Sequence, residues 1–296
     1  MQKLLLKDLQ SSIKSLHTSA INQITSVQGG CIHDAWCIEL KNGQKLFAKT
    51  NQKQNFPILE FEAEGLKVLK KYTDESLLEI PITLNLSKES ELSVLTMNWI
   101  DMQQGDQTKL GEGLARLHRV SAEKNSGKFG WAKNGFIGSG IQIGGWEEEW
   151  GKSFVLLRLL PQLEIAEKWG IKISEHSNLL ENLIDFLNQH NPKPSLVHGD
   201  LWSGNAATNA SGLGVIFDPA AWWADREVDI AMTYLFGGFS SEFYKGYEKV
   251  WPLSNTAKYR YCIYNLYHLL NHANLFGGGY KQQCLSQIKE LRLKFN

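Results

Sequence analysis

The sequence lacks the features that mark disulfide-stabilised, membrane-spanning or nucleic-acid-binding proteins. It has four cysteines, too few and too scattered for a disulfide scaffold or a Cys-x-x-Cys metal site: Cys31, Cys37, Cys262 and Cys284. No apolar run approaches membrane-spanning length, and residues 4–6 are too short a run for a signal-peptide core. Lys+Arg and Asp+Glu balance at 31 each, so no overall field favours nucleic acid or an anionic membrane. We therefore expect a cytoplasmic protein.

The bulk composition is that of an ordinary globular protein. The chain has 296 residues, of which 43% are hydrophobic and 21% charged, so it is long enough for two lobes with cores of their own. The charge balance favours a small or neutral substrate over a polyanion.

The most informative stretch runs from residue 196 to residue 218. Asp200 is followed five positions later by Asn205, and after a short hairpin Asp218 closes an apolar strand. This is the spacing of a kinase catalytic loop and metal site. Phosphoryl transfer from ATP needs one carboxylate to orient the attacking hydroxyl and accept its proton, and oxygen ligands for Mg²⁺. We assign the first role to Asp200, and the second to Asn205 and Asp218.

Each half of this pattern has a simpler interpretation. His198-Gly-Asp alone is more often a surface turn, and Phe217-Asp218-Pro219 alone is more often a strand end. The two motifs at the spacing of a kinase site are far rarer by chance than either motif alone, which favours the catalytic interpretation.

These motifs closely resemble those of the fructosamine kinase (ketosamine-3-kinase) family. The resemblance is carried by His198-Gly-Asp-Leu-Trp-Ser-Gly-Asn205, Asp218-Pro-Ala, Asp225-Arg-Glu-Val-Asp-Ile-Ala231, Tyr267-His-Leu-Leu-Asn-His272 and Asn274-Leu-Phe-Gly-Gly-Gly-Tyr280. Upstream it includes Leu110-Gly-Glu-Gly-Leu-Ala-Arg-Leu-His118, Asn134-Gly-Phe-Ile-Gly-Ser139 and Gly29-Gly-Cys-Ile32, so it spans nearly the whole chain.

The resemblance implies an α+β, two-lobed protein-kinase-like fold of the aminoglycoside-phosphotransferase type. We expect a small β-rich ATP-binding lobe over residues 1–97, a hinge over 98–103, and a larger, mostly helical catalytic and substrate lobe over 104–296. It also implies that ATP and Mg²⁺ are used to phosphorylate the sugar 3-hydroxyl of a ketosamine, either a small molecule or a glycated protein, which leads to deglycation.

A glycine turn is expected to approach the ATP phosphates in the first lobe. Gly29, Gly30 and Cys31 lie between two predicted strands, where glycine lets backbone N–H groups reach a phosphate. Two adjacent glycines are more often only a hairpin turn, and position is what favours the functional interpretation. The turn is not Gly-x-Gly-x-x-Gly and no Ala-Pro-Glu follows, which points away from protein kinases and toward a small-molecule kinase.

Lys49 is the expected phosphate-binding lysine, because it ends the strand between the glycine turn and an acidic helix. By default such a lysine would be a solvated edge residue. Glu60, Glu62 and Glu64 are all candidates to pair with it. The family resemblance selects Glu62, which would hold Lys49 against the phosphates.

Two other segments are placed by position. Met97, Asn98 and Trp99 fall where the two lobes join, so their backbone groups are candidates to bind the adenine edge, with a plain buried strand as the alternative. Residues 127–145 are rich in glycine and aromatic residues and look irregular, as functional loops do. We place Phe136 and Trp146 on the acceptor side.

Several further roles follow from the resemblance. Trp202 is expected to stack on the substrate, and Asp229 to brace the catalytic loop with His198 beside it; a core tryptophan and a helix N-terminal acid are the alternatives. His272 is assigned to helix packing or the pocket wall as a substrate residue. With His268 four residues away it is weak evidence for a metal, because no third ligand is evident.

Regulation and rival functions remain open. Oxidation of Cys31, or a disulfide-linked dimer through it, would block ATP, whereas an inert turn thiol in a monomer is the alternative. The rival functions are another kinase of this fold acting on an aminoglycoside, a macrolide or choline, and a non-catalytic pseudokinase. A pseudokinase usually loses the lysine, the base or the metal aspartate, and this chain retains all three.

Overall fold

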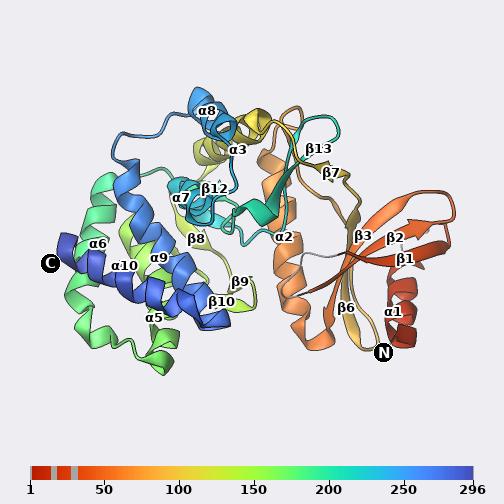
Figure 1. Ribbon diagram of the computed structural model, residues 1–296, viewed down its shortest axis with the longest axis horizontal. Helices are drawn as coiled ribbons and strands as arrows, with labels where there is room; N and C mark the ends of the chain where they lie inside the picture. The colour runs from red at the N-terminus through yellow and green to blue at the C-terminus, as the bar shows by residue number, and fades with distance from the viewer. Residues whose placement is uncertain (1, 15–18, 28–32, 296) are drawn as a thin grey trace.

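The computed structural model describes residues 2–14, 19–27 and 33–295. The glycine turn with Gly29, Gly30 and Cys31 therefore lies outside the described residues. One end of the molecule is built on a five-stranded antiparallel sheet and the other mainly on helices (Figure 1). No helix in the described ranges combines the length and apolarity needed to cross a bilayer.

The N-terminal sheet has the strand order β1-β2-β3-β6-β5. Its strands are β1 (Ile21–Val27), β2 (Asp34–Leu40), β3 (Lys45–Gln52), β5 (Thr83–Lys88) and β6 (Leu92–Asn98). An Asn-Gly turn joins β2 to β3: Gly43 has φ 83°, and the Asn42 side chain accepts a hydrogen bond from Gln44 N at 3.1 Å. Two helices pack on this sheet, α1 (Gln2–Lys14) and α2 (Phe56–Tyr72).

The N-terminal part contributes to two hydrophobic cores, and the larger of them extends into the C-terminal part. A small core of Leu9, Ile13, Ile38, Leu46 and Val94 lies between α1 and the sheet. On the other face, α2 and the sheet join a continuous core with the C-terminal helices. Helix α2 therefore packs against both halves, and the division expected at residue 97 stays a prediction.

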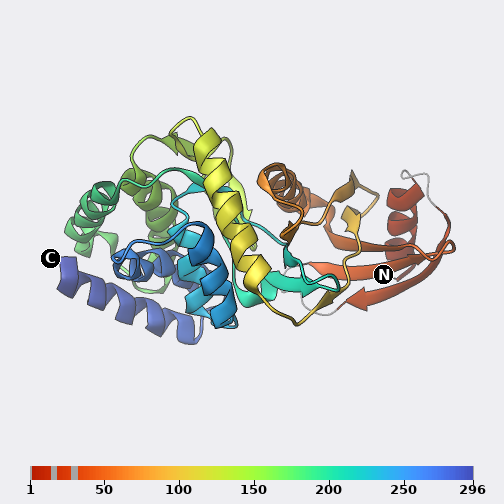
Figure 2. The ribbon, with the colours of Figure 1, turned by 90° about the horizontal axis from the view of Figure 1, so that it is seen from above.

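The C-terminal part is mostly helical, as Figure 2 shows from above. Its helices are α3 (Thr108–Lys124), α4 (Trp150–Phe154), α5 (Leu160–Ala166), α6 (Ser177–His190), α7 (Glu227–Leu235), α8 (Ser241–Val250), α9 (Ala257–Phe276) and α10 (Gly279–Phe295). Three small sheets lie between these helices and the N-terminal sheet; they are ordered β10-β9, β11-β8-β15-β12 and β4-β14-β13-β7.

The segment that we expected to be irregular forms short strands. They are β8 (Phe129–Trp131), β9 (Gly135–Ile137), β10 (Gly140–Gln142) and β11 (Gly145–Glu147). Their pairing partners are in part distant in sequence, since β8 pairs with β15 (Trp222–Ala224), and local sequence patterns do not reveal such non-local pairing.

One small sheet ties the catalytic hairpin to the connector between the two parts. The hairpin strands are β13 (Ala206–Asn209) and β14 (Gly214–Ile216), and they pair with β7 (Met102–Gln103) and β4 (Leu78–Glu79), respectively. The side chain of Asn209 stabilises the hairpin turn by accepting hydrogen bonds from Ser211 N and Leu213 N, both at 2.9 Å. The hairpin therefore lies between the two halves of the molecule.

Candidate active site

The catalytic loop begins where the buried strand β12 (Ser195–Val197) ends. Gly199 adopts a left-handed conformation with φ 82°, and a Cβ on it would lie 2.1 Å from the backbone oxygen of Ala220. Only glycine is compatible with both the conformation and this close approach. The sharp turn at Gly199 directs the chain to Asp200.

Asp229 holds this loop in place through hydrogen bonds to its backbone. Its two carboxylate oxygens accept hydrogen bonds from His198 N at 2.7 Å and from Gly199 N at 2.8 Å. Burial tends to raise the pKa of Asp229, but the hydrogen bond and charge of His118 and the loop N–H groups lower it overall. Asp229 thus contacts the loop as a buried carboxylate, in the bracing position expected for it.

His118 is a member of this group that the sequence did not single out. Its Nε2 lies 3.1 Å from Asp229 Oδ2 and its Nδ1 lies 2.9 Å from the Tyr247 hydroxyl. Its single signal in the sequence is its place at the end of the Leu110–His118 motif, which says nothing of its partners.

His198 joins the catalytic loop to the strand end before Asp218. Because the Phe217 carbonyl can only accept, the His198 Nε2 atom that lies 2.9 Å from it carries the ring proton. Nδ1 then accepts the N–H of Asp200 at 3.3 Å. Burial lowers the pKa of His198, which keeps the ring in this neutral form.

Asp200 and Asn205 face each other across the loop. The Asn205 side-chain amide donates to the backbone oxygen of Asp200 at 2.9 Å and to its Oδ2 at 3.3 Å. Oδ1 of Asp200 is buried and has no partner among the described residues. Burial, and then the charge of Asp218, raise the pKa of Asp200 to about 7. The free oxygen can accept a hydrogen bond from a hydroxyl group.

Lys49 lies between two carboxylates. Its Nζ is 2.7 Å from Glu62 Oε1 and 2.7 Å from Asp218 Oδ1, so of the three candidate glutamates Glu62 is the one that pairs with it. Glu64 pairs instead with Lys133 at 2.7 Å. Burial opposes the charge on Lys49, but the two carboxylates outweigh it and raise the lysine's pKa. Burial also raises the pKa of Glu62, to about 7.

Asp218 is held in a rare backbone conformation. It is one of two non-glycine residues with positive φ in the described chain, at 60°. Such strain persists only where the surroundings over-determine it, and it concentrates at functional sites. The side chain of Asp218 is 43% exposed. Partial burial of its carboxyl group tends to raise its pKa, but the positive charge of Lys49 and its hydrogen bond outweigh this effect and lower the pKa.

The oxygen donors fit the magnesium ion that kinase chemistry requires. Asp218 offers a carboxylate, and because the Asn205 amide nitrogen faces Asp200, its side-chain oxygen remains as a ligand atom. Mg²⁺ prefers such hard oxygen donors and binds through one or two protein groups together with substrate phosphates.

The expected substrate residues are spread more widely. Trp202 is 36% exposed and lies over Gly204, where a Cβ would be 2.2 Å from its ring. Phe136 packs edge-on against Phe61 of α2, and Trp146 is 45% exposed in β11. Neither Phe136 nor Trp146 makes a hydrogen bond or ring contact with Asp200 within the described part of the chain, and their acceptor-side role stays a prediction.

His272 stands in an aromatic cluster. Its ring centroid is 5.0 Å from that of Phe236, 5.1 Å from that of Tyr280 and 5.7 Å from that of Phe276. Its Nδ1 donates to the backbone oxygen of His268 at 2.9 Å, because a carbonyl only accepts. His268 is fully buried, and neither histidine belongs to a three-ligand cluster within the described ranges.

The connector follows β6, which lies between β3 and β5 in the sheet. Met97 pairs with both neighbouring strands and is 2% exposed, and Asn98 N donates to the Ile82 oxygen at 3.3 Å. Trp99 is the first residue beyond the strand, and its ring nitrogen donates to Asp101 at 2.7 Å. The adenine-binding role of Met97, Asn98 and Trp99 stays a prediction.

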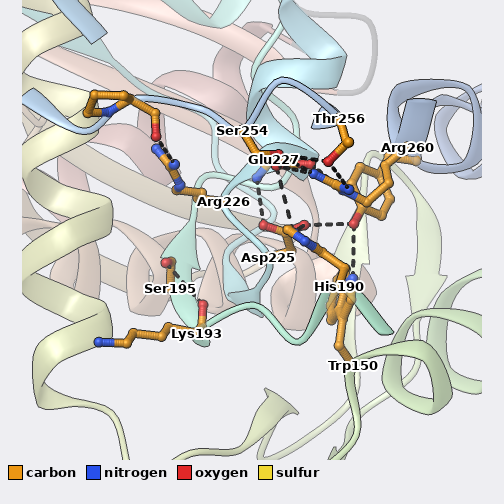
Figure 3. A network of polar contacts seen from close by, with 12 residues as sticks. Trp150, His190, Lys193, Ser195, Asp225, Arg226, Glu227, Ser254, Thr256 and Arg260 are labelled. Carbon is orange, nitrogen blue, oxygen red and sulfur yellow. Dashed lines mark hydrogen bonds and ion pairs between the residues drawn. The ribbon is translucent and has the colours of Figure 1, made fainter. Parts of the chain in front are cut away.

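A second acidic cluster lies behind the loop (Figure 3). Asp225, Glu227 and His190 have ligand atoms within 4.8 Å of one another. However, Arg260 binds both oxygens of Glu227 at 2.7 Å, and Tyr264 donates to Asp225 at 2.7 Å. These carboxylates are already satisfied, so the cluster connects β15, α6, α7 and α9 and needs no metal ion to do so.

Comparisons with known proteins identify the family of this chain. The fructosamine kinase family model matches residues 5–294. The chain belongs to this family. A "Probable ketoamine kinase" from Synechocystis sp. is 37% identical over 273 residues, covering 91% of this chain and 90% of the relative. The rice "Protein-ribulosamine 3-kinase, chloroplastic" is 34% identical over 276 residues, covering 91% of this chain and 79% of the relative.

Comparison with solved structures identifies the fold class of this chain. The crystal structure of the "Putative fructosamine-3-kinase" from Haemophilus somnus is similar with a TM-score of 0.85 and 25% identity, covering 97% of each chain. The two-lobed α+β fold is thus that of the protein-kinase-like phosphotransferases, as expected.

Proposed function

We propose that this fructosamine kinase family member is an ATP-dependent ketosamine kinase that phosphorylates the 3-hydroxyl of the sugar moiety. The observation that carries the proposal is the convergence of Lys49, Glu62 and Asp218 with the Asp200–Asn205 pair, in a family whose relatives are named for this activity. All three groups that a pseudokinase tends to lose are present.

Each residue has a defined task in this proposal. Asp200 accepts a hydrogen bond, and then the proton, from the acceptor hydroxyl through its unpartnered Oδ1. Lys49, held by Glu62, contacts the phosphates. Asn205 and Asp218 would hold Mg²⁺. When bound, Mg-ATP supplies the phosphoryl group and neutralises the charge that develops during transfer.

The remaining assignments complete the site. We assign the adenine contacts to the backbone of Met97, Asn98 and Trp99, and sugar stacking to the exposed ring of Trp202. Phe136, Trp146 and His272 are proposed on the acceptor side. The ATP-binding part is residues 1–97, the hinge 98–103 and the catalytic part 104–296.

The product chemistry explains the biological use of the reaction. A phosphate on carbon 3, next to the carbonyl carbon of a ketosamine, is a leaving group for elimination. The adduct then decays and frees the amine, so the enzyme would act as a deglycation factor for metabolites or proteins. A cytoplasmic monomer, with a disulfide-linked dimer through Cys31 as the oxidised form, remains our expectation.

Mass spectrometry tests the proposal directly. Fructosyl-, ribulosyl- and erythrulosyl-amines are incubated with the protein and Mg-ATP, with an aminoglycoside, a macrolide and choline as alternative acceptors. We expect one phosphoryl adduct on a ketosamine that is absent with Asp200→Asn. Phosphorylation of only the alternative acceptors would refute the ketosamine assignment, and no ATP turnover with any acceptor would favour the pseudokinase.

A further inference from the structure

His33 lies beside the phosphate-binding group but has no role in the site described so far. It directly precedes β2 and is half-buried. The groups that act on its ring electrostatically are Lys49, Asp218 and Asp34. His33 lies next to Asp34 and Ala35, which pair with Thr50 and Lys49 in the sheet, so a histidine this near the lysine is a candidate to meet the nucleotide.

The neighbouring Asn51 fixes how this ring is protonated. Oδ1 of Asn51 accepts the backbone N–H of Gln52 at 2.7 Å and the side-chain amide of Asn55 at 2.9 Å. A backbone N–H can only donate, so the Asn51 oxygen must face Gln52. The Asn51 nitrogen is then the atom that lies 2.8 Å from His33 Nδ1, and it donates to that ring nitrogen.

It follows that the ring proton of His33 is on Nε2. A proton on Nδ1 would place two donors face to face, so the doubly protonated ring is disfavoured. Burial, and then the charge of Lys49, lower the pKa of His33 to about 4, in agreement with a neutral ring. Within residues 2–14, 19–27 and 33–295 the His33 ring makes its hydrogen bond through Nδ1, and no residue of these ranges competes for the Nε2–H group.

We propose that His33 is a further nucleotide-binding residue, whose neutral Nε2–H donates a hydrogen bond to a phosphate oxygen of the nucleotide next to Lys49. This rests on the proposed function only in that ATP is the phosphoryl donor. Lys49 already divides its charge between Glu62 and Asp218, so the phosphate chain needs further donors. A neutral donor provides one without attracting Asp218 away from its metal-binding position.

Direct nucleotide titration of His33 variants tests this proposal without any acceptor. We compare His33→Ala, His33→Asn and His33→Gln with the unchanged protein, using isothermal calorimetry with AMP-PNP and Mg²⁺, and adenosine as the ligand without phosphates. His33→Ala and His33→Asn should weaken AMP-PNP binding roughly tenfold and leave adenosine binding unchanged. His33→Gln should retain most of the affinity, because its amide N–H can reach the position of Nε2–H.

A second variant changes the tautomer without touching the histidine. Asn51→Asp still accepts the Gln52 N–H, but it presents an acceptor to Nδ1 and draws the ring proton there. Nε2 then keeps a proton only when the ring is charged. Affinity for AMP-PNP should therefore fall as the pH rises from 6 to 8 in Asn51→Asp, and stay nearly flat in the unchanged protein.

The outcomes separate this inference from the proposed function. Unchanged AMP-PNP affinity in His33→Ala, or a loss in His33→Gln as large as in His33→Ala, would overturn the role of His33 and leave the kinase intact. An equal loss of adenosine binding would show a fold defect rather than a phosphate contact, and would also overturn it. If the unchanged protein bound no nucleotide, both proposals would fail.

Discussion

The C-terminal half contains two acidic clusters that differ in how well they are satisfied. Around Asp225 and Glu227, every carboxylate oxygen has a partner in His190, Tyr264, Arg260 or the Glu227 backbone. Around Asp200 and Asp218, one oxygen is buried without a partner and one backbone is strained. Buried polar groups are normally paired, so the exceptions indicate where a ligand completes the structure.

The comparison teaches that a cluster of acids alone does not identify a site. The satisfied cluster has the geometry of three potential metal ligands, but its charges are neutralised by the protein itself. The unsatisfied cluster depends on something outside the chain. We therefore expect mutations in the first to change stability and mutations in the second to change activity.

Asp218→Asn should have the largest effect. It removes the proposed carboxylate ligand for Mg²⁺ and a partner of Lys49. The expected loss of several kcal/mol of transition-state stabilisation lowers kcat by about 10³-fold or more. ADP release in the presence of a ketosamine measures the effect, and calorimetry should show weaker binding of Mg-AMP-PNP. Normal turnover would show that Asp218 is not the metal ligand.

Asp200→Asn should lower kcat by about 10²–10⁴-fold while nucleotide binding remains. The same change should stabilise the fold. The pKa of Asp200 is raised from 3.8 to about 7, so the folded state loses stability relative to the unfolded chain as the pH rises through this window. The gain in Tm of the variant should grow from pH 5 to pH 7 and level off above.

The pH profile distinguishes this mechanism from a general packing effect. A constant gain in Tm at every pH would contradict an ionisable origin. A gain that tracks the titration, together with lost turnover, would show that the protein carries an unfavourable charge at Asp200 because catalysis requires it.

Arg260→Met should reverse the pattern in the satisfied cluster. In the variant, Glu227 stays buried but loses the arginine that binds both of its carboxylate oxygens. This loss should lower the free energy of unfolding by about 3 kcal/mol. Activity per folded molecule should change little. The matched control is Lys249→Met, which breaks an exposed ion pair with Glu112 and should cost less than about 1 kcal/mol in urea unfolding. Equal costs would contradict the contrast.

His118→Phe tests a residue that links structure to catalysis. The variant lacks the hydrogen bond between His118 and Asp229, so Asp229 should position the loop that carries Asp200 less well. We expect kcat to fall between about 10- and 100-fold. Tyr247→Phe removes the outer bond of the same chain, together with the hydroxyl's contact with Arg226 at 3.3 Å, and should have a smaller effect on kcat. A weaker affinity for AMP-PNP in His118→Phe would instead indicate general loosening of the fold.

Trp202→Ala should have the smallest effect. If its exposed ring stacks on the sugar, the KM for the ketosamine should rise about fivefold, because a stacking contact contributes about 1 kcal/mol. The kcat should stay within twofold, and Trp202→Phe should recover most of the affinity. A change in kcat alone would place the ring in loop positioning rather than in substrate binding.

Much of the site could be predicted from local patterns because its parts lie close together in sequence. Asp200, Asn205 and Asp218 fall within 19 residues of one chain segment, joined by a hairpin with clear turn residues. The pairing of Lys49 was open among three glutamates by pattern alone, and the family resemblance pointed to Glu62, which the geometry supports.

What the sequence could not predict depends on residues far apart in the chain. The contact of His118 with Asp229 spans 111 positions, and the proton on His33 is fixed by a side chain 18 positions away. Within residues 129–147, β9 pairs with β10 and β11 with β8, but β8 also pairs with the distant strand β15. Local propensity is blind to such partners.

The sequence by itself determined the candidates for the chemistry of this protein: a carboxylate proposed to activate a hydroxyl, oxygens proposed to bind a metal and a lysine proposed to bind phosphate are recognisable from residue type and spacing. Only the tertiary structure decided which acids are neutralised and which are left open. That distinction depends on burial and on hydrogen-bond partners brought together from distant segments, and a buried carboxylate without a partner is costly unless a ligand uses it.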